Sequence, residues 1–176
     1  MLPVEIPETT PPTELIDGRL VQKTGGELRH QTLELRWTLV LRAWSGQVGE
    51  ALHEWRHEFR APGHSFASLV PDVAYLSRDS LEALGPAASE KPPRAPDVAV
   101  EILSAGESER HLTWKIGAYL AAGTRVVFVV DAPKRTVIAH SRDGVERFGP
   151  GDTVRRPAMS GFAYAIDAMF DGLYLG

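Results

Sequence analysis

The sequence has 176 residues, of which 43% are hydrophobic and 24% are charged, and its formal net charge is −4. This length is enough for one domain with a buried core but short for two, and the composition is that of an ordinary soluble globular protein. The negative charge argues against a protein that coats nucleic acid through charge alone, but it does not exclude a nucleic-acid enzyme, because a carboxylate-lined metal site makes a protein more acidic. The chain has no cysteine, which excludes disulfides and thiolate metal sites.

Residues 1–12 are rich in proline and threonine and predict a flexible leader in front of a single domain at 13–176. The leader has neither the basic region nor the apolar region of a secretion signal. No apolar run in the chain approaches the roughly 20 residues that a membrane-spanning helix needs. We therefore expect a cytoplasmic protein that does not enter a membrane.

The first elements after the leader are a hairpin and a helix. Segment 14–26 predicts a hairpin that turns at Asp17 and Gly18, with apolar residues on the returning strand. Residues 27–45 carry hydrophobic side chains at a spacing of mostly about 3.6 residues, which predicts a helix.

Two short apolar runs predict strands at 72–77 and 97–104, joined by a polar loop. A second helix at 108–123 and a strongly apolar strand at 125–131 follow. The strand, helix and strand from residue 97 onwards predict a parallel crossover. Two strands around an Asp-Gly turn at 143–144 come next, and the tail has enough apolar residues to pack on the body. These elements predict the α/β class, with a mixed sheet flanked by helices.

The segment from His53 to His57 reads H-E-x-x-H, the pattern of a zinc peptidase, which needs both histidines on one face of a helix. Apolar and charged residues alternate here with a period of two, which predicts a half-buried strand. Histidines four residues apart on a strand are about 13 Å apart, too far to share one zinc ion. We therefore reject the zinc interpretation.

Glu101 lies inside the otherwise apolar strand 97–104, where an unpaired carboxylate is costly to bury. If strand 72–77 pairs antiparallel with it, Asp72 comes to lie beside Glu101. Asp97 is on the same face as Glu101 but about 13 Å away, so we expect a turn residue there. Two carboxylates that converge at a sheet end predict an oxygen-ligand site suited to Mg²⁺ or Mn²⁺.

Lys115 falls on the stripe of the second helix that carries Leu112, Ile116 and Tyr119, which we expect to face inward. One interpretation is a lysine that packs its stem and extends its ammonium to solvent. The other is a cation beside the two acidic ligands, which compensates charge at a phosphate and helps to orient or deprotonate water. His30, at the start of the first helix, could also face this site.

The chain resembles a bacterial family of putative restriction endonucleases, the Uma-type family of the PD-(D/E)XK nuclease superfamily. The resemblance covers nearly the whole chain after the leader and rests on the order and spacing of its pieces. These pieces are ELIDGRLV, the pair His30-Gln31, PDVAYLS, APDVAVEILS, a helix with K…YLAAGT, VVFVVD with a hairpin after it, and MSGFAYAIDAMF. The resemblance implies a restriction-endonuclease-like core, in which helices flank a mixed central sheet.

The superfamily pattern is an aspartate followed by Glu-x-Lys on the adjacent strand. By resemblance, Asp72 and Glu101 are the metal ligands and the backbone carbonyl of Ile102 is a third. Leu103 stands where the lysine is expected, and in this type of family the lysine has moved to the following helix, at the place of Lys115. The resemblance leaves three candidates for supporting roles: His30, Ser104 and Tyr119.

The resemblance implies an endonuclease that uses Mg²⁺ or Mn²⁺ to hydrolyse phosphodiester bonds of DNA, and it suggests a homodimer. A catalytically inactive, nuclease-derived binding module is the alternative, since Leu103 breaks the strand motif and the net charge is negative. Hydrolysis of another phosphoester or of a small molecule is a third option.

Overall fold

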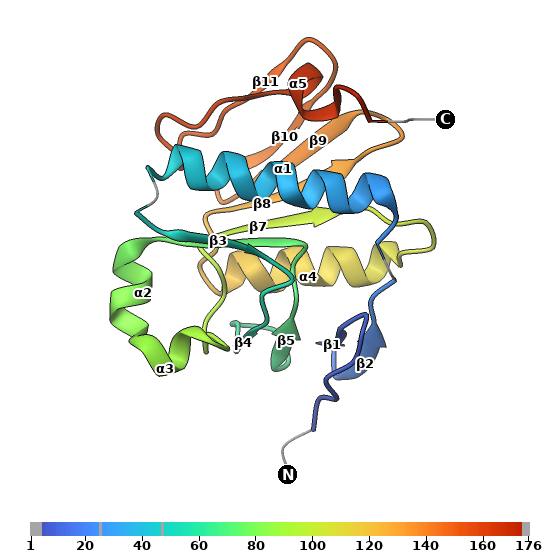
Figure 1. The fold of residues 1–176 in the computed structure, drawn as a ribbon. Coiled ribbons are helices and arrows are strands. Elements are labelled where there is room, and N and C mark those ends of the chain that lie inside the picture. The colour runs from blue at the N-terminus through green and yellow to red at the C-terminus, as the bar shows by residue number, and fades with distance from the viewer. Residues whose placement is uncertain (1–4, 25, 47, 174–176) are drawn as a thin grey trace.

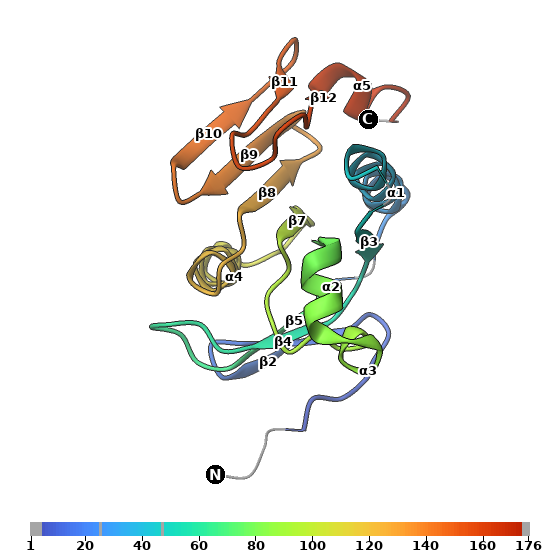
Figure 2. The same ribbon diagram turned by 90° about the vertical axis from the view of Figure 1, so that its left-hand side faces the viewer.

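The computed structural model describes residues 5–24, 26–46 and 48–173. At its centre is a six-stranded mixed sheet with the strand order β10-β9-β8-β7-β6-β3. Its strands are β3 (Glu50–His53), β6 (Val73–Leu76), β7 (Val98–Ile102), β8 (Val126–Asp131), β9 (Thr136–Ser141) and β10 (Gly144–Phe148). The helices are α1 (Leu28–Trp44), α2 (Arg78–Leu84), α3 (Pro86–Ser89), α4 (Glu109–Ala121) and α5 (Ile166–Phe170). Helices α1 and α4 lie on opposite faces of the sheet (Figures 1 and 2), so the predicted α/β architecture is confirmed.

A second, four-stranded antiparallel sheet has the order β2-β1-β5-β4 and packs on the α4 side of the central sheet (Figure 2). Its strands are β1 (Thr13–Ile16), β2 (Arg19–Gln22), β4 (His57–Phe59) and β5 (Ala67–Leu69), and a separate pair is formed by β11 (Thr153–Val154) and β12 (Tyr164–Ala165). Strands β1 and β2 are the predicted hairpin. Its turn residues Asp17 and Gly18 both have positive φ, 50° and 72°.

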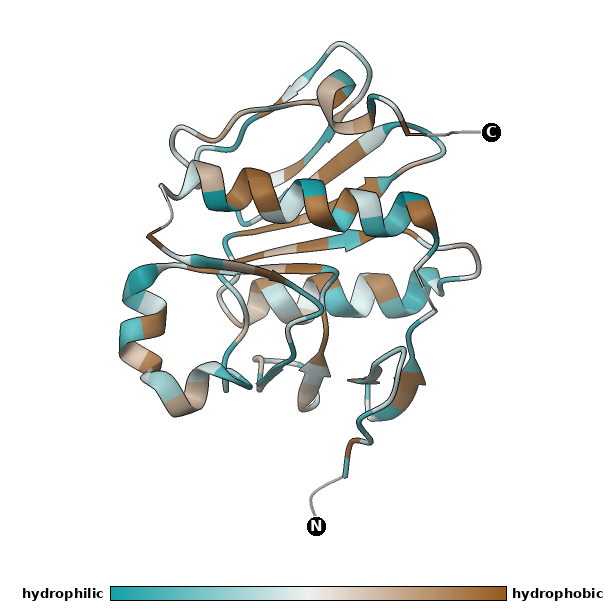
Figure 3. Ribbon diagram, viewed as in Figure 1, coloured by the Kyte–Doolittle hydropathy of each residue, from teal (hydrophilic) through white to brown (hydrophobic). Residues whose placement is uncertain are grey.

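Strand β7 is buried on both faces because a helix covers each of them. Val98 and Val100 belong to the core on the α1 side, where Trp37 packs. Ala99 belongs to the core on the α4 side, together with Tyr119. Side chains alternate along a strand, so Glu101 shares the α4 face with Ala99. Figure 3 shows that α1 carries both hydrophobic and hydrophilic residues along its length, and those that belong to the core are Leu33, Trp37 and Leu41.

Two pairings of β7 decide where the site lies. Strand β6 pairs antiparallel with it, and Val73 lies opposite Val100. Asp72, one residue before β6, therefore comes to lie beside Glu101, as predicted. On its other edge β7 pairs parallel with β8, which confirms the crossover through α4.

The segment from His53 to His57 is not one half-buried strand, so that prediction was wrong. Strand β3 ends at His53, Glu54 adopts a positive φ of 49°, and β4 begins at His57 in the other sheet. The left-handed residue redirects the chain from one sheet to the other, which a period of two cannot reveal. The two histidines belong to different sheets, which agrees with the rejection of the zinc interpretation.

The connection between β6 and β7, predicted as a polar loop, contains α2 and α3. Ser77 caps α2 by accepting a hydrogen bond from the Ser80 backbone N–H, and Pro86 stands at the start of α3. Both helices are too short to show a clear repeat of apolar residues, and they lie in a stretch rich in proline, alanine and serine, so the sequence did not predict them.

The tail packs back on the α1 side of the sheet, as predicted for the part of it that the structure describes. Phe162, Ile166 and Met169 are buried in that core, while 174–176 lie outside the described residues. Of the predicted leader, residues 5–12 form neither helix nor strand, and 1–4 also lie outside the described residues. Among the described helices, none has the length and apolar character needed to cross a membrane.

Candidate active site

Asp72 is almost completely buried, and both of its carboxylate oxygens have partners. Oδ2 accepts a hydrogen bond of 2.5 Å from the backbone N–H of Ile102. Oδ1 lies 2.5 Å from the ammonium of Lys23 and 3.2 Å from Nε2 of His30. Burial raises the pKa of Asp72, but Lys23 and His30 lower it by more, so the pKa lies well below its ordinary value. Asp72 is therefore an anion at neutral pH.

Glu101 lies beside Asp72 and is buried against α4. Its Oε2 accepts a hydrogen bond from Nζ of Lys115 at 2.6 Å, and its Oε1 accepts one from the hydroxyl of Tyr119 at 3.0 Å. Burial raises the pKa of Glu101 above its ordinary value, and the charge of Lys115 opposes that shift only in part. Helix α4 thus supplies the partners that make a carboxylate tolerable inside β7.

Lys115 is a buried cation with only 2% of its side chain exposed, so the interpretation in which its ammonium reaches solvent was wrong. Its Nζ contacts Glu101 and also lies 3.2 Å from Oε2 of Glu14, on β1. Glu14 is itself held by a 2.7 Å hydrogen bond from the Val70 backbone N–H to Oε1. Burial lowers the pKa of Lys115, but the two carboxylates raise it by more, so Lys115 stays charged well beyond neutral pH.

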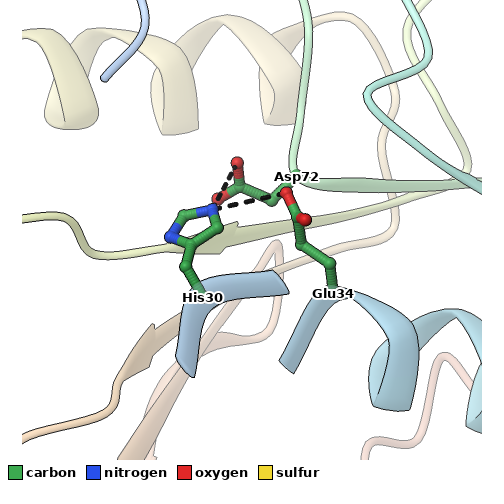
Figure 4. A group of neighbouring side chains, drawn as sticks. All are labelled: His30, Glu34 and Asp72. Carbon is green, nitrogen blue, oxygen red and sulfur yellow. Dashed lines mark ion pairs between the residues drawn. The ribbon is translucent and has the colours of Figure 1, made fainter. Parts of the chain in front are cut away.

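His30 and Glu34 extend the site across the sheet from the first turns of α1 (Figure 4). With Asp72 they bring three ligand atoms within 4.8 Å of one another. His30 Nε2 lies 3.4 Å from Glu34 Oε1, and Nδ1 lies 3.3 Å from Oγ of Ser104. Burial lowers the pKa of His30, but Asp72 and Glu34 raise it to about 10. His30 is therefore protonated here, and it must lose a proton before it can bind a metal.

One cavity of about 250 Å³ is lined by Glu14, His30, Asp72, Glu101 and Lys115. The site residues predicted from the sequence that line it are His30, Asp72, Glu101, Ile102, Ser104 and Lys115. Tyr119, the remaining one, reaches Glu101 from α4. Asp97 lies elsewhere and accepts hydrogen bonds from Ser77 and Ser80, in agreement with the turn role predicted for it.

The sequence did not reveal Glu14, Lys23 and Glu107, which line this cavity, or Glu34, which lines the neighbouring depression. Glu34 follows His30 by four residues, so the helix period could have placed it on the same face. Glu14 and Lys23 lie in the β1–β2 hairpin, which meets the site only because β1 pairs with β5 and the second sheet packs on α4. That packing leaves no local signal in the sequence.

The donor atoms at the sheet end suit a hard divalent cation. Asp72 and Glu101 offer carboxylate oxygens from two neighbouring strands. The N–H and C=O of one strand residue point to the same edge, and the N–H of Ile102 points to Asp72, so its carbonyl lies on that side too. Oxygen donors of this kind fit Mg²⁺ or Mn²⁺.

A family model described as a putative restriction endonuclease, Uma2, matches residues 2–167. The chain belongs to the Uma2 family. Among solved structures, this Uma2 chain is similar to a crystal structure described as a putative nuclease belonging to DUF820 from Anabaena variabilis ATCC 29413. The identity is 26% and the TM-score is 0.80, and the match covers 94% of this chain and 93% of that one. A comparison with curated proteins found no match.

The Uma2 match confirms the family that the sequence resembles. The solved neighbour confirms that helices flank a mixed sheet in a nuclease-like fold. Family and neighbour together support a nuclease, and hence a hydrolase.

Proposed function

We propose that this protein is a metal-dependent endonuclease that hydrolyses phosphodiester bonds of DNA, with Asp72 and Glu101 as its metal ligands. The observation that carries the proposal is the convergence of these two buried carboxylates, from adjacent antiparallel strands, on one cavity that also contains buried cations. A site with this chemistry matches the requirements of phosphodiester hydrolysis. Membership in Uma2 and the nuclease neighbour support the same reaction class.

Asp72, Glu101 and the backbone carbonyl of Ile102 would hold Mg²⁺ or Mn²⁺. When bound, such an ion polarises the phosphate and lowers the pKa of a coordinated water. The protein's own part is to keep the ligands in place. The Ile102 N–H fixes one oxygen of Asp72, and Tyr119 fixes one oxygen of Glu101.

Lys115 contributes positive charge to the cavity. Because Glu101 and Glu14 keep it protonated, it acts as a fixed cation and does not accept a proton at neutral pH. Its charge favours the additional negative charge that a phosphodiester acquires in the transition state. Lys115 also positions Glu101, since its Nζ holds Oε2 at 2.6 Å. His30 performs the equivalent task for Asp72, with Ser104 on its other ring nitrogen.

Incubation of plasmid and oligonucleotide substrates with and without Mg²⁺ tests the proposal. We expect the wild-type protein to cleave DNA only with the metal. Glu101→Ala removes a ligand and should reduce the rate at least about a hundredfold while the circular dichroism spectrum stays that of the folded protein. Cleavage by Glu101→Ala at the wild-type rate would show that this site does not carry the reaction.

An inactive binding module derived from a nuclease is the second candidate, favoured by Leu103 at the position of the motif lysine. Calorimetric titration with Mn²⁺ separates the two, because a module without the metal site would show no binding that depends on Asp72. The homodimer and the cytoplasmic location stay predictions from the sequence, as does the choice of DNA over another phosphoester.

A further inference from the structure

Lys23 is the residue after β2, and its ammonium contacts Asp72, one of the two proposed metal ligands. Nζ lies 2.5 Å from Oδ1 of Asp72 and donates a hydrogen bond of 2.9 Å to the carbonyl of Val70. The backbone of Lys23 is anchored by a 2.9 Å hydrogen bond to the carbonyl of Pro12. The hairpin therefore delivers this lysine to Asp72 in a defined position.

The contacts of Asp72 leave a metal little choice of where to bind. Oδ2 accepts a hydrogen bond from the N–H of Ile102, the last residue of β7. Oδ1 is shared between Lys23 and His30. An entering cation that uses Oδ1 of Asp72 must therefore compete with these two donors.

Lys23 and Lys115 differ in how firmly the structure holds them. Lys115 is enclosed by Glu101 and Glu14 and has 2% of its side chain exposed. Lys23 pairs with Asp72 and a backbone carbonyl, and its side chain is 12% exposed. It also lines a neighbouring depression of about 330 Å³, where Glu34 and Glu54 offer other carboxylates. Lys23 thus has both an exit and new partners available, while Lys115 is already held by two carboxylates.

We propose that Lys23 is an exchangeable internal cation, which neutralises Asp72 in the metal-free protein and must leave Oδ1 when a divalent metal binds. The β1–β2 hairpin, which Lys23 follows, would then lower the affinity of the site for the metal. This inference rests on the proposed function, since it concerns the same metal ligand, but it assigns a role to a residue outside the nuclease motif. Lys23 and His30 already place two positive charges at Oδ1, so a divalent cation at this oxygen is repelled by both and competes with Lys23 for it.

The test is the affinity for Mn²⁺, measured by the loss of the free-ion electron paramagnetic resonance signal, in wild type, Lys23→Met and Lys23→Gln. Both variants remove the competing charge, and Lys23→Gln keeps a hydrogen-bond donor for Asp72. We expect both to bind Mn²⁺ about tenfold more tightly or better, because a neighbouring cation changes the proton affinity of a carboxylate by about one to three pKa units. Circular dichroism confirms that each variant is folded.

Lys134→Met is the matched control, because Lys134 also pairs with an aspartate, Asp131, at 2.6 Å, but its side chain is 71% exposed and does not line this cavity. It changes the net charge equally and should leave the affinity unchanged. Unchanged or weaker binding by both Lys23 variants would overturn the inference, and so would equal tightening in Lys134→Met. Asp72→Asn distinguishes the two proposals. If it binds Mn²⁺ as tightly as wild type, the proposed metal site is wrong. If it loses binding, the metal site stands, and the Lys23 variants then test the exchange of Lys23 alone.

Discussion

At the scale of single residues, the site is a chain of buried charges that alternate in sign. Glu14, Lys115 and Glu101 follow one another at hydrogen-bond distance on the α4 side. Lys23, Asp72 and His30 do the same at the start of β6. A buried charge is tolerated only with such partners. Removal of one member therefore leaves its neighbour buried without a partner, which lowers the stability of the protein.

Lys115→Met tests this dependence. The variant leaves Glu101 and Glu14 without their shared cation. Burial already raises the pKa of Glu101, so we expect Glu101 to take up a proton and the free energy of unfolding to fall by about 1–3 kcal/mol. Urea denaturation at neutral pH measures it. The double variant Lys115→Met with Glu101→Gln should recover part of the loss, since the amide is neutral without taking up a proton. A loss below about 1 kcal/mol in Lys115→Met would mean that the carboxylates do not need this lysine.

His57 supplies a pH dependence outside the cavity. It is fully buried on β4, burial lowers its pKa to about 4, and its Nδ1 lies 2.9 Å from the carbonyl of Arg94. The folded-state pKa is below the unfolded value, so the stabilising contribution of neutral His57 is complete above about pH 6.5. It is lost as the pH falls to about 4, and the loss is roughly 3 kcal/mol.

Urea denaturation of wild type and His57→Gln at pH 7 and pH 4 isolates this contribution. The carboxylates titrate in both proteins, so the difference between the two pH dependences belongs to His57. We expect the wild-type protein to lose more stability on acidification than His57→Gln does. Equal losses in the two proteins would contradict a depressed pKa at His57.

At the scale of elements, three connections build the site. The tight turn of the β1–β2 hairpin, the antiparallel β6–β7 pair and the crossover through α4 each bring charged residues to one sheet end. The hairpin places Glu14, which lies in β1, and Lys23, which follows β2. Its turn sets the register between these two strands and therefore the position of both side chains.

Gly18→Ala tests the hairpin. Gly18 has a φ of 72°, so a side chain there is strained although there is open space around it. We expect a loss of about 1 kcal/mol in the free energy of unfolding, measured with urea. Gly149→Ala is the control, because Gly149 also has open space but does not adopt a left-handed φ. If both substitutions had the same effect, backbone strain at Gly18 would not govern the hairpin.

At the scale of the whole molecule, the sequence predicted the elements with a clear period and the pairings that follow from them. The crossover and the β6–β7 pair were predictable because β7 and β8 are apolar, and they were sufficient to bring Asp72 to Glu101. The turn at Glu54 and the two short helices α2 and α3 were missed, because a single left-handed residue and a helix of a few residues leave no periodic pattern. Lys23 was missed because its partner Asp72 is 49 residues away and meets it only through packing.

The central claim is that Asp72 and Glu101 form the metal site of a nuclease, and Asp97 offers a comparison within the same fold. Asp97 is buried at the other end of β7, where it pairs with Arg94 at 2.8 Å. It has a hydrogen-bonding environment similar to that of Asp72 but does not line the cavity.

The most direct measurement is the single-turnover rate of plasmid cleavage with Mg²⁺ or Mn²⁺ for wild type, Asp72→Asn and Asp97→Asn, with folding checked for each. Asp72→Asn keeps the shape of the side chain but removes the charge that a metal needs. We predict that it reduces the rate at least about a hundredfold while folded Asp97→Asn stays within a few fold of wild type. Cleavage by Asp72→Asn at the rate of wild type would contradict the assignment of Asp72 and Glu101 as the active site.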